Sequence, residues 1–143
     1  MSAPEVDEFG WLDTGVFIHA LFPNDPLSVP ARHVLARVEH GQASGWLDVV
    51  VVHELTYVLP RTKLPAFVQR DGVAEYISRV LALDGIRADA KDELLETLAL
   101  WRAGQVAFAD ARLAVMGGRR GLPVCSPNRR DFTAVPNSFP DVL

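Results

Sequence analysis

Short apolar segments alternate with amphipathic helical segments along this chain, and that alternation constrains its fold more than any other feature. The apolar run at residues 9–12 stops at Asp13, and residues 16–21 continue with the spacing of a buried helix. Further strand-like segments follow at residues 46–52, around Ile86 and at 122–125. Strands separated by helices form parallel sheets with crossover connections. We therefore expect an α/β fold, a three-layer α/β/α sandwich with a short, mostly parallel central sheet.

The stretches between these segments have the periodicity of helices. Residues 46–52 begin as a strand and run into a helix that ends near Pro60, because apolar residues continue there at helical spacing. Further helices are expected at residues 30–39, 66–83, 90–102 and 106–116, the last apolar nearly all round and stopped by Gly117 and Gly118. A chain of 143 residues with 49% hydrophobic content suits one compact domain, so residues 1–143 are expected to form a single domain.

Composition limits the kind of protein this is. The net charge of −4 disfavours a protein that holds nucleic acid by bulk electrostatic attraction, although four arginines gather toward the C-terminal end at Arg119, Arg120, Arg129 and Arg130. Solvated loops explain Arg119 and Arg120 equally well. The single cysteine, Cys125, cannot form an internal disulfide, and no Cys and His spacing suits zinc. Residues 1–10 are acidic, and no run of about 18 apolar residues follows, so we expect a cytoplasmic protein without a membrane segment.

Acidic and amide side chains recur at or just after the expected strand ends, where parallel α/β sheets bind ligands. Asp13 is explained equally well as a helix cap, Glu54 as a first-turn glutamate, and Asp131 as an ordinary turn residue. Asp110 is different, because it lies in an apolar helix where burying a lone carboxylate costs several kcal/mol. It needs a counter-ion, and a metal or a distant residue suits this role better than nearby Arg112.

Together these carboxylates suit a hard divalent cation. Mg²⁺ and Mn²⁺ take oxygen ligands, keep several waters, and leave coordination positions open for phosphate. A metal held in this way orients a water for in-line attack on phosphorus and neutralises the charge that develops there. The residues thus favour phosphodiester chemistry that needs no nucleophilic side chain.

Four segments resemble the motifs of PIN-domain ribonucleases, and of VapC-type toxins of type II toxin–antitoxin systems in particular. They are LDTGVF at residues 12–17, HELTYVL at 53–59, FADARLA at 108–114 and VCSPNRRDF at 124–132. The resemblance implies that Asp13, Glu54 and Asp110 are the catalytic metal ligands for Mg²⁺ or Mn²⁺. Thr14 and Ser126 would orient the site by hydrogen bonding. Asn128 stands where many relatives have Asp, and Asp131 could substitute for it as a ligand.

The same resemblance implies endonucleolytic cleavage of RNA, a homodimer, and inhibition by a cognate antitoxin protein. Arg129 and Arg130 lie within the fourth motif and could contact RNA phosphates. His53 would point about 100° away from Glu54 on a helix, so we interpret it as a surface residue rather than a general base.

Three other functions share features with this pattern. A phosphoryl-accepting receiver domain fits poorly, because Lys63 and Lys91 are the only lysines and neither follows a late strand. A non-catalytic PIN domain that binds RNA or a protein partner stays open, because Asn128 departs from the acidic pattern. A DNA-cutting nuclease also stays open, since only contacts to the 2′-hydroxyl would distinguish the two substrates.

Overall fold

The computed structural model describes residues 7–140, and the chain divides into two compact units, Met1–Asp89 and Ala90–Leu143. Each unit has its own internal packing, and the expected single domain over residues 1–143 stays a prediction. The first six residues of the acidic segment at 1–10 lie outside the described residues. Among residues 7–140, no helix has the combination of length and apolarity needed to cross a bilayer.

A three-stranded parallel sheet organises the first unit. β1 (Asp7–Trp11), β2 (Ala43–Trp46) and β3 (Ile86–Arg87) lie side by side in the order β1-β2-β3, and both pairings are parallel. Pairing continues one residue beyond the strands, because Leu12 N–H donates to the Trp46 carbonyl and Leu47 N–H to the Arg87 carbonyl, each at 2.8 Å. The expected α/β class and the parallel sheet are confirmed.

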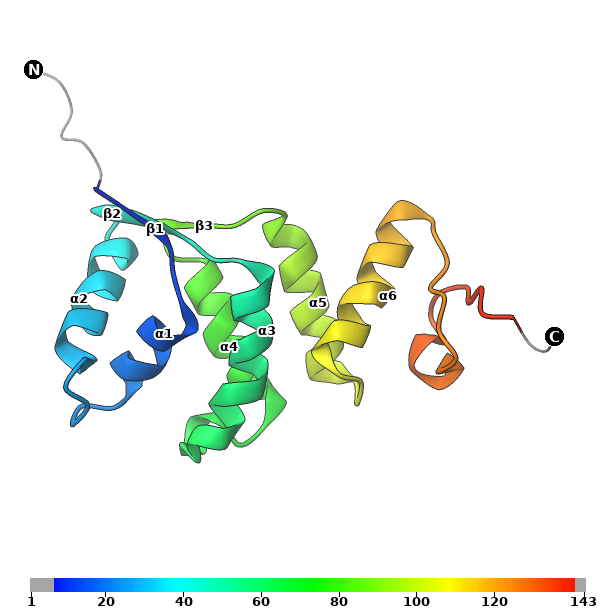
Figure 1. The fold of residues 1–143 in the computed structure, drawn as a ribbon, viewed down its shortest axis with the longest axis horizontal. Coiled ribbons are helices and arrows are strands. Elements are labelled where there is room, and N and C mark those ends of the chain that lie inside the picture. Colours follow the sequence, from blue (N-terminus) through cyan, green and yellow to red (C-terminus); the bar gives the residue numbers. More distant parts are fainter. Residues whose placement is uncertain (1–6, 141–143) are drawn as a thin grey trace, which may run out of the picture. The chain divides into compact units, whose positions relative to one another are not determined.

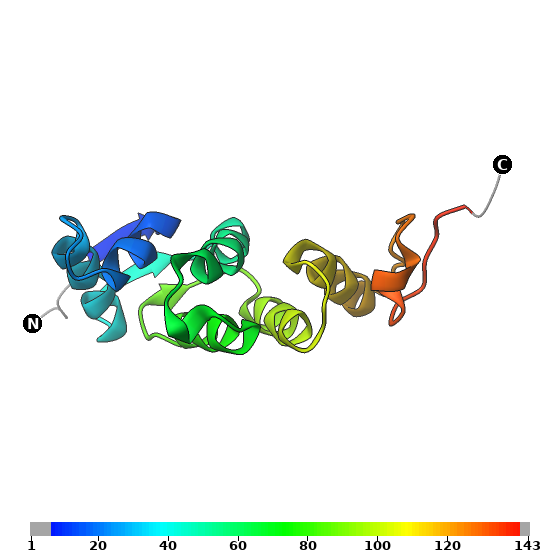
Figure 2. The same ribbon diagram turned by 90° about the horizontal axis from the view of Figure 1, so that it is seen from below.

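Two helical crossovers connect these strands. α1 (Thr14–Leu21) and α2 (Ser28–Glu39) lead from β1 to β2, and α3 (Val49–Val58) and α4 (Arg70–Leu81) lead from β2 to β3. Two 3-10 turns, η1 (Leu59–Thr62) and η2 (Pro65–Phe67), join α3 to α4. Each crossover moves one strand further in the same direction, and such crossovers are almost always right-handed. Both helix pairs therefore lie on the same face of the sheet (Figure 1 and Figure 2).

The core of the first unit forms between that face and the helices. Leu12, Leu47 and Ile86 are buried at the ends of the strands, and Phe17 of α1 and Leu55 of α3 are fully buried among the helices. Gly45 in β2 makes this packing possible, because a Cβ atom at that position would lie 2.8 Å from side-chain carbons of Leu12. The absence of a side chain at residue 45 thus lets Leu12 pack directly against the neighbouring strand.

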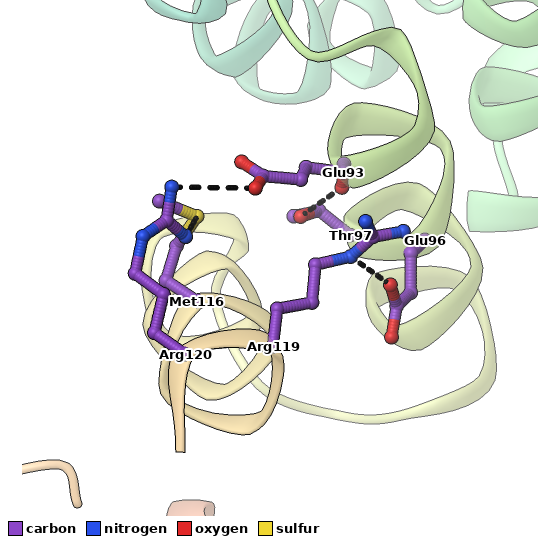
Figure 3. Close-up of polar contacts among 6 residues, drawn as sticks. All are labelled: Glu93, Glu96, Thr97, Met116, Arg119 and Arg120. Atoms are coloured by element: carbon purple, nitrogen blue, oxygen red, sulfur yellow. Dashed lines mark hydrogen bonds and ion pairs between the residues drawn. The ribbon is translucent and has the colours of Figure 1, made fainter. Parts of the chain in front are cut away.

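The second unit is built on a helical hairpin. α5 (Lys91–Ala103) and α6 (Phe108–Arg120) pack together, and η3 (Arg129–Phe132) follows. Arg119 Nε donates to Glu96 Oε2 at 2.5 Å, and Arg120 pairs with Glu93 at 3.3 Å (Figure 3). The pairing raises the pKa of Arg119, chiefly through the hydrogen bond to Glu96. Arg119 and Arg120 thus connect the two helices of the hairpin.

Two expectations for the first unit need correction. The strand before α3 is Ala43–Trp46, and the valines at residues 49–52 form the first turn of the helix rather than part of a strand. Asp48 starts that helix, because its Oδ2 accepts a hydrogen bond from Val50 N–H at 3.0 Å. The helix expected at residues 66–83 begins only at Arg70, because η2 occupies the preceding residues.

Two expectations for the second unit were also wrong. α6 continues through Gly117 and Gly118 and ends at Gly121, whose φ of 63° is the left-handed conformation typical of a residue that terminates a helix. The strand expected at residues 122–125 is a single bridge between Val124 and Asn137, and it belongs to no sheet among the described residues. Val124 instead packs with Ala114 and Phe132.

Replacing Gly45 with alanine is expected to lower the free energy of unfolding by about 1–3 kcal/mol, because the added methyl group overpacks Leu12. Urea unfolding followed by tryptophan fluorescence measures this change. Gly118→Ala is the control, since its nearest neighbour would be 4.0 Å away and alanine favours a helix. A Gly45→Ala protein as stable as the wild type would contradict the packing argument.

Candidate metal-binding carboxylates

Asp13 follows β1 and precedes α1 without capping it. Its backbone has the extended conformation of an N-cap residue, with φ −82° and ψ 155°, yet its side chain makes no capping hydrogen bond. Asp48 provides a direct comparison, because it follows β2 with nearly the same angles, φ −86° and ψ 154°, and does cap α3. The capping explanation therefore accounts for Asp48 but not for Asp13, whose carboxylate is exposed.

Glu54 lies on α3, which leaves the end of β2. It is the sixth residue of that helix and exposed, and α3 has no acidic residue in its first turn, so the helix-dipole explanation for Glu54 does not apply. The Thr14 hydroxyl donates a hydrogen bond to Glu54 Oε2, and Thr14 itself is buried. The bond spans 40 positions of sequence and holds Glu54 against the residue next to Asp13.

The sheet explains why Thr14, the neighbour of Asp13 in the sequence, reaches Glu54. β1 and β2 are parallel neighbours, so their carboxyl ends lie at the same edge, and α1 and α3 begin there and contact one another. Asp13 and Thr14 come from the first strand end and Glu54 from the helix after the second. His53, beside Glu54, is exposed, as expected for a surface residue.

The sequence did not predict that His19 lies near Asp13 or that His19 pairs with Asp25. A methyl group placed on Gly15 would lie 3.7 Å from Asp13 Oδ2 and 3.9 Å from His19 Nε2, so both side chains border Gly15. His19 Nδ1 is 2.6 Å from Asp25 Oδ2. No histidine spacing in the sequence pointed to this pair, because the Asp25 loop folds back onto α1 only through the turn at residues 22–25.

Asp110 belongs to the second unit, in the first turn of α6. It is half-buried rather than fully buried, which corrects the expectation that an isolated carboxylate is enclosed there. The positive end of the helix dipole stabilises a negative charge in this position and lessens its need for a counter-ion. The role of Asp110 as a metal ligand therefore stays a prediction from its sequence motif.

The polar residues of the fourth motif bond mainly to one another. Asn128 N–H donates to Ser126 Oγ at 3.0 Å, and Asn128 Nδ2 donates to Asp131 Oδ2 at 2.7 Å. Arg129 donates to the Phe139 carbonyl at 2.9 Å, while Arg130 is exposed. Ser126, Asn128 and Asp131 thus stabilise their own turn.

The donor chemistry of the first unit fits magnesium or manganese. Asp13 and Glu54 provide exposed carboxylate oxygens at one sheet edge, and a few carboxylates with waters are the ligands Mg²⁺ prefers. Within residues 7–140, no three side chains of the His, Cys, Asp and Glu types are gathered as a metal-binding group.

No protein-family model matches the chain, and neither does any curated protein.

The pKa of Asp25 is lowered, first by the Leu27 N–H donating to Oδ1 at 2.8 Å and then by its hydrogen bond with His19. The charged carboxylate therefore stabilises the fold above its ordinary pKa of 3.8, and this contribution disappears as the pH falls through the lower folded-state pKa. Asp25→Asn is expected to be less stable than the wild type at neutral pH, with the difference shrinking in acid. Denaturant unfolding across pH measures it, and parallel curves for the two proteins would contradict this role.

Proposed function

We propose that this chain is a metal-dependent endoribonuclease of the PIN-domain type that hydrolyses RNA phosphodiester bonds. The observation that carries the proposal is the hydrogen bond from Thr14 to Glu54, which joins the first and second acidic motifs at one edge of a parallel sheet. The α/β architecture supports it, with one helical layer on the sheet of the first unit. The finer proposal is a PIN-like three-layer α/β/α sandwich.

The proposed chemistry follows from the carboxylates. Asp13 and Glu54, with Asp110 by its motif, would hold Mg²⁺ or Mn²⁺, and Asn128 or Asp131 would complete the ligand set. When bound, the metal supplies charge neutralisation at the phosphate and a lowered pKa for its water. Thr14 keeps Glu54 in position, and Gly15 leaves space beside the Asp13 carboxylate because it has no side chain. Without a cation, the carboxylates would repel an RNA phosphate.

The biological setting is proposed from the same motifs. The chain would act in the cytoplasm as the toxin of a VapBC-type pair, as a homodimer, with a cognate antitoxin protein as its inhibitor. Arg129 and Arg130 would contact RNA phosphates, and Arg130 is exposed. A PIN domain that binds RNA or a protein without cutting is the alternative.

Cleavage of a mixed structured RNA pool by the purified protein tests this proposal. We expect cutting with Mg²⁺ or Mn²⁺ that is lost in EDTA and abolished in Asp13→Asn, Glu54→Gln and Asp110→Asn. Glu75→Gln is the matched control, because Glu75 is an exposed carboxylate on α4 whose ion pair is with Arg79, one helical turn away. Folded, inhibitor-free protein that binds RNA without cutting would favour the alternative, and cutting of single-stranded DNA in parallel would broaden the substrate class.

Substitutions of Thr14 test whether its hydrogen bond positions the Glu54 carboxylate, because Thr14 itself is not a proposed metal ligand. Thr14→Val keeps the shape of the buried side chain but removes the donor to Glu54, so we expect activity to fall about 10–100-fold. The Mg²⁺ concentration for half-maximal activity should rise, whereas Thr14→Ser should restore both values. Metal titrations of the cleavage rate measure this. An unchanged metal requirement in a folded Thr14→Val protein would show that the hydrogen bond does not organise the site.

A further inference from the structure

An exposed face of α3 carries Glu54 together with an aromatic residue. Val50, Glu54 and Tyr57 recur at helical spacing along this face, and all three are exposed. Arg61 follows in η1, directly after the helix. Residues three apart on a helix have Cβ atoms about 5–6 Å from each other, so the Tyr57 ring projects from the surface next to Glu54.

Tyr57 and Arg61 form a stacked pair. The guanidinium carbon of Arg61 is 3.3 Å from the centroid of the Tyr57 ring, and Arg61 Nη1 donates to the Tyr57 carbonyl at 2.5 Å. That hydrogen bond holds the planar guanidinium over one face of the ring. An arginine has five N–H donors, so this contact leaves most of them for a further acceptor.

The ring is not part of the protein core. Tyr57 is 59% exposed even with Arg61 over it. The other described tyrosine, Tyr76, shows what a structural role looks like here. It is half-buried, packs edge-on against Phe67 with ring centroids 5.3 Å apart, and has a pKa raised by burial. Core packing therefore explains Tyr76 but not Tyr57.

We propose that Tyr57 and Arg61 bind single-stranded RNA, with a nucleobase stacked on the pair and a phosphate oxygen accepting from Arg61. Aromatic rings and arginine planes bind unpaired bases in this way, because every base offers a π face. A duplex would not fit the role, since its bases are stacked and paired inside the helix. The inference rests on the proposed function in one respect: Glu54 marks the place where the RNA backbone is cut.

The charges around Tyr57 and Arg61 suit single-stranded RNA. A metal at the carboxylates would attract one phosphate, and Arg61 adds a positive charge at the neighbouring end of the same helix for another. Consecutive nucleotides of an unpaired strand could therefore contact Glu54 and the Tyr57–Arg61 pair together. This gives an acidic chain with net charge −4 a local means of binding an anionic polymer.

Binding of fluorescent oligouridine tests the stacking, measured by anisotropy with Mg²⁺ present and with Asp110→Asn added to every protein compared in order to prevent cleavage. Tyr57→Ala should weaken binding about 5- to 150-fold, whereas Tyr57→Phe and Tyr57→Trp should bind like the wild type. Val68→Ala is the control, because Val68 is 63% exposed but not aromatic. Since Tyr57 is on the surface, thermal unfolding of each variant should match that of the wild type.

Salt dependence tests the phosphate contact. Arg61→Gln should flatten the slope of log Kd against log salt concentration by about 0.7, the value for one phosphate on a single strand. Arg79→Gln, which removes an exposed arginine from the surface pair with Glu75, should leave the slope unchanged.

The outcomes of these experiments distinguish a failure of the RNA-binding inference from a failure of the proposed nuclease chemistry. If the wild type cuts RNA but Tyr57→Ala binds oligouridine as well as the wild type, the inference is overturned and the nuclease stands. If Tyr57→Phe binds as weakly as Tyr57→Ala, or an RNA duplex binds more tightly than oligouridine, stacking is also excluded. If Tyr57→Ala weakens binding but the wild type cuts nothing with Mg²⁺ or Mn²⁺, the RNA surface stands and the proposed chemistry fails.

Discussion

The parallel pairing of β1 with β2 is the constraint on which the rest of the first unit depends. Because the two strands run in the same direction, their carboxyl ends meet at one edge, and the helices that follow both begin there. The pairing is close because Gly45 offers no side chain to Leu12. The chain then needs only short loops to bring α1 and α3 together, although their sequences are far apart. Everything assigned to the candidate site in this unit follows from that edge.

Asp13 and Asp48 have nearly the same backbone geometry but use their carboxylates differently. Both aspartates follow neighbouring strands and have almost the same backbone angles, but only Asp48 uses its carboxylate to cap a helix. α3 needs that cap because it begins with four valines, and β-branched residues are poor helix formers. α1 begins instead with Thr14, whose hydroxyl is directed to Glu54. A carboxylate that stabilises no helix is available for a ligand, which is why Asp13 stands out.

α3 connects the candidate chemistry with a candidate RNA surface. Its inner face is buried through Val52 and Leu55, so its outer face is free to carry Glu54 and Tyr57. Packing against the core thus determines the residues on the inner face of α3. It does not determine the polar and aromatic residues on the outer face. Arg61 covers part of the aromatic ring without burying it. The same rigid element would position both a metal ligand and a stacking platform, which keeps their separation constant.

Sequence alone determined the α/β class, the helices and the positions of the acidic residues, because apolar periodicity and chain breaks are local properties. It did not determine that the valines at residues 49–52 are helical, since the Asp48 cap and packing against the core overrode their strand preference. Nor did it show that residues 122–125 lack a sheet partner, because pairing depends on which segments meet in space. Only the tertiary structure joined Thr14 to Glu54 and His19 to Asp25, because these hydrogen bonds form between side chains that no sequence spacing relates. It also decided that Tyr57 is exposed, because burial depends on which elements pack against a helix face.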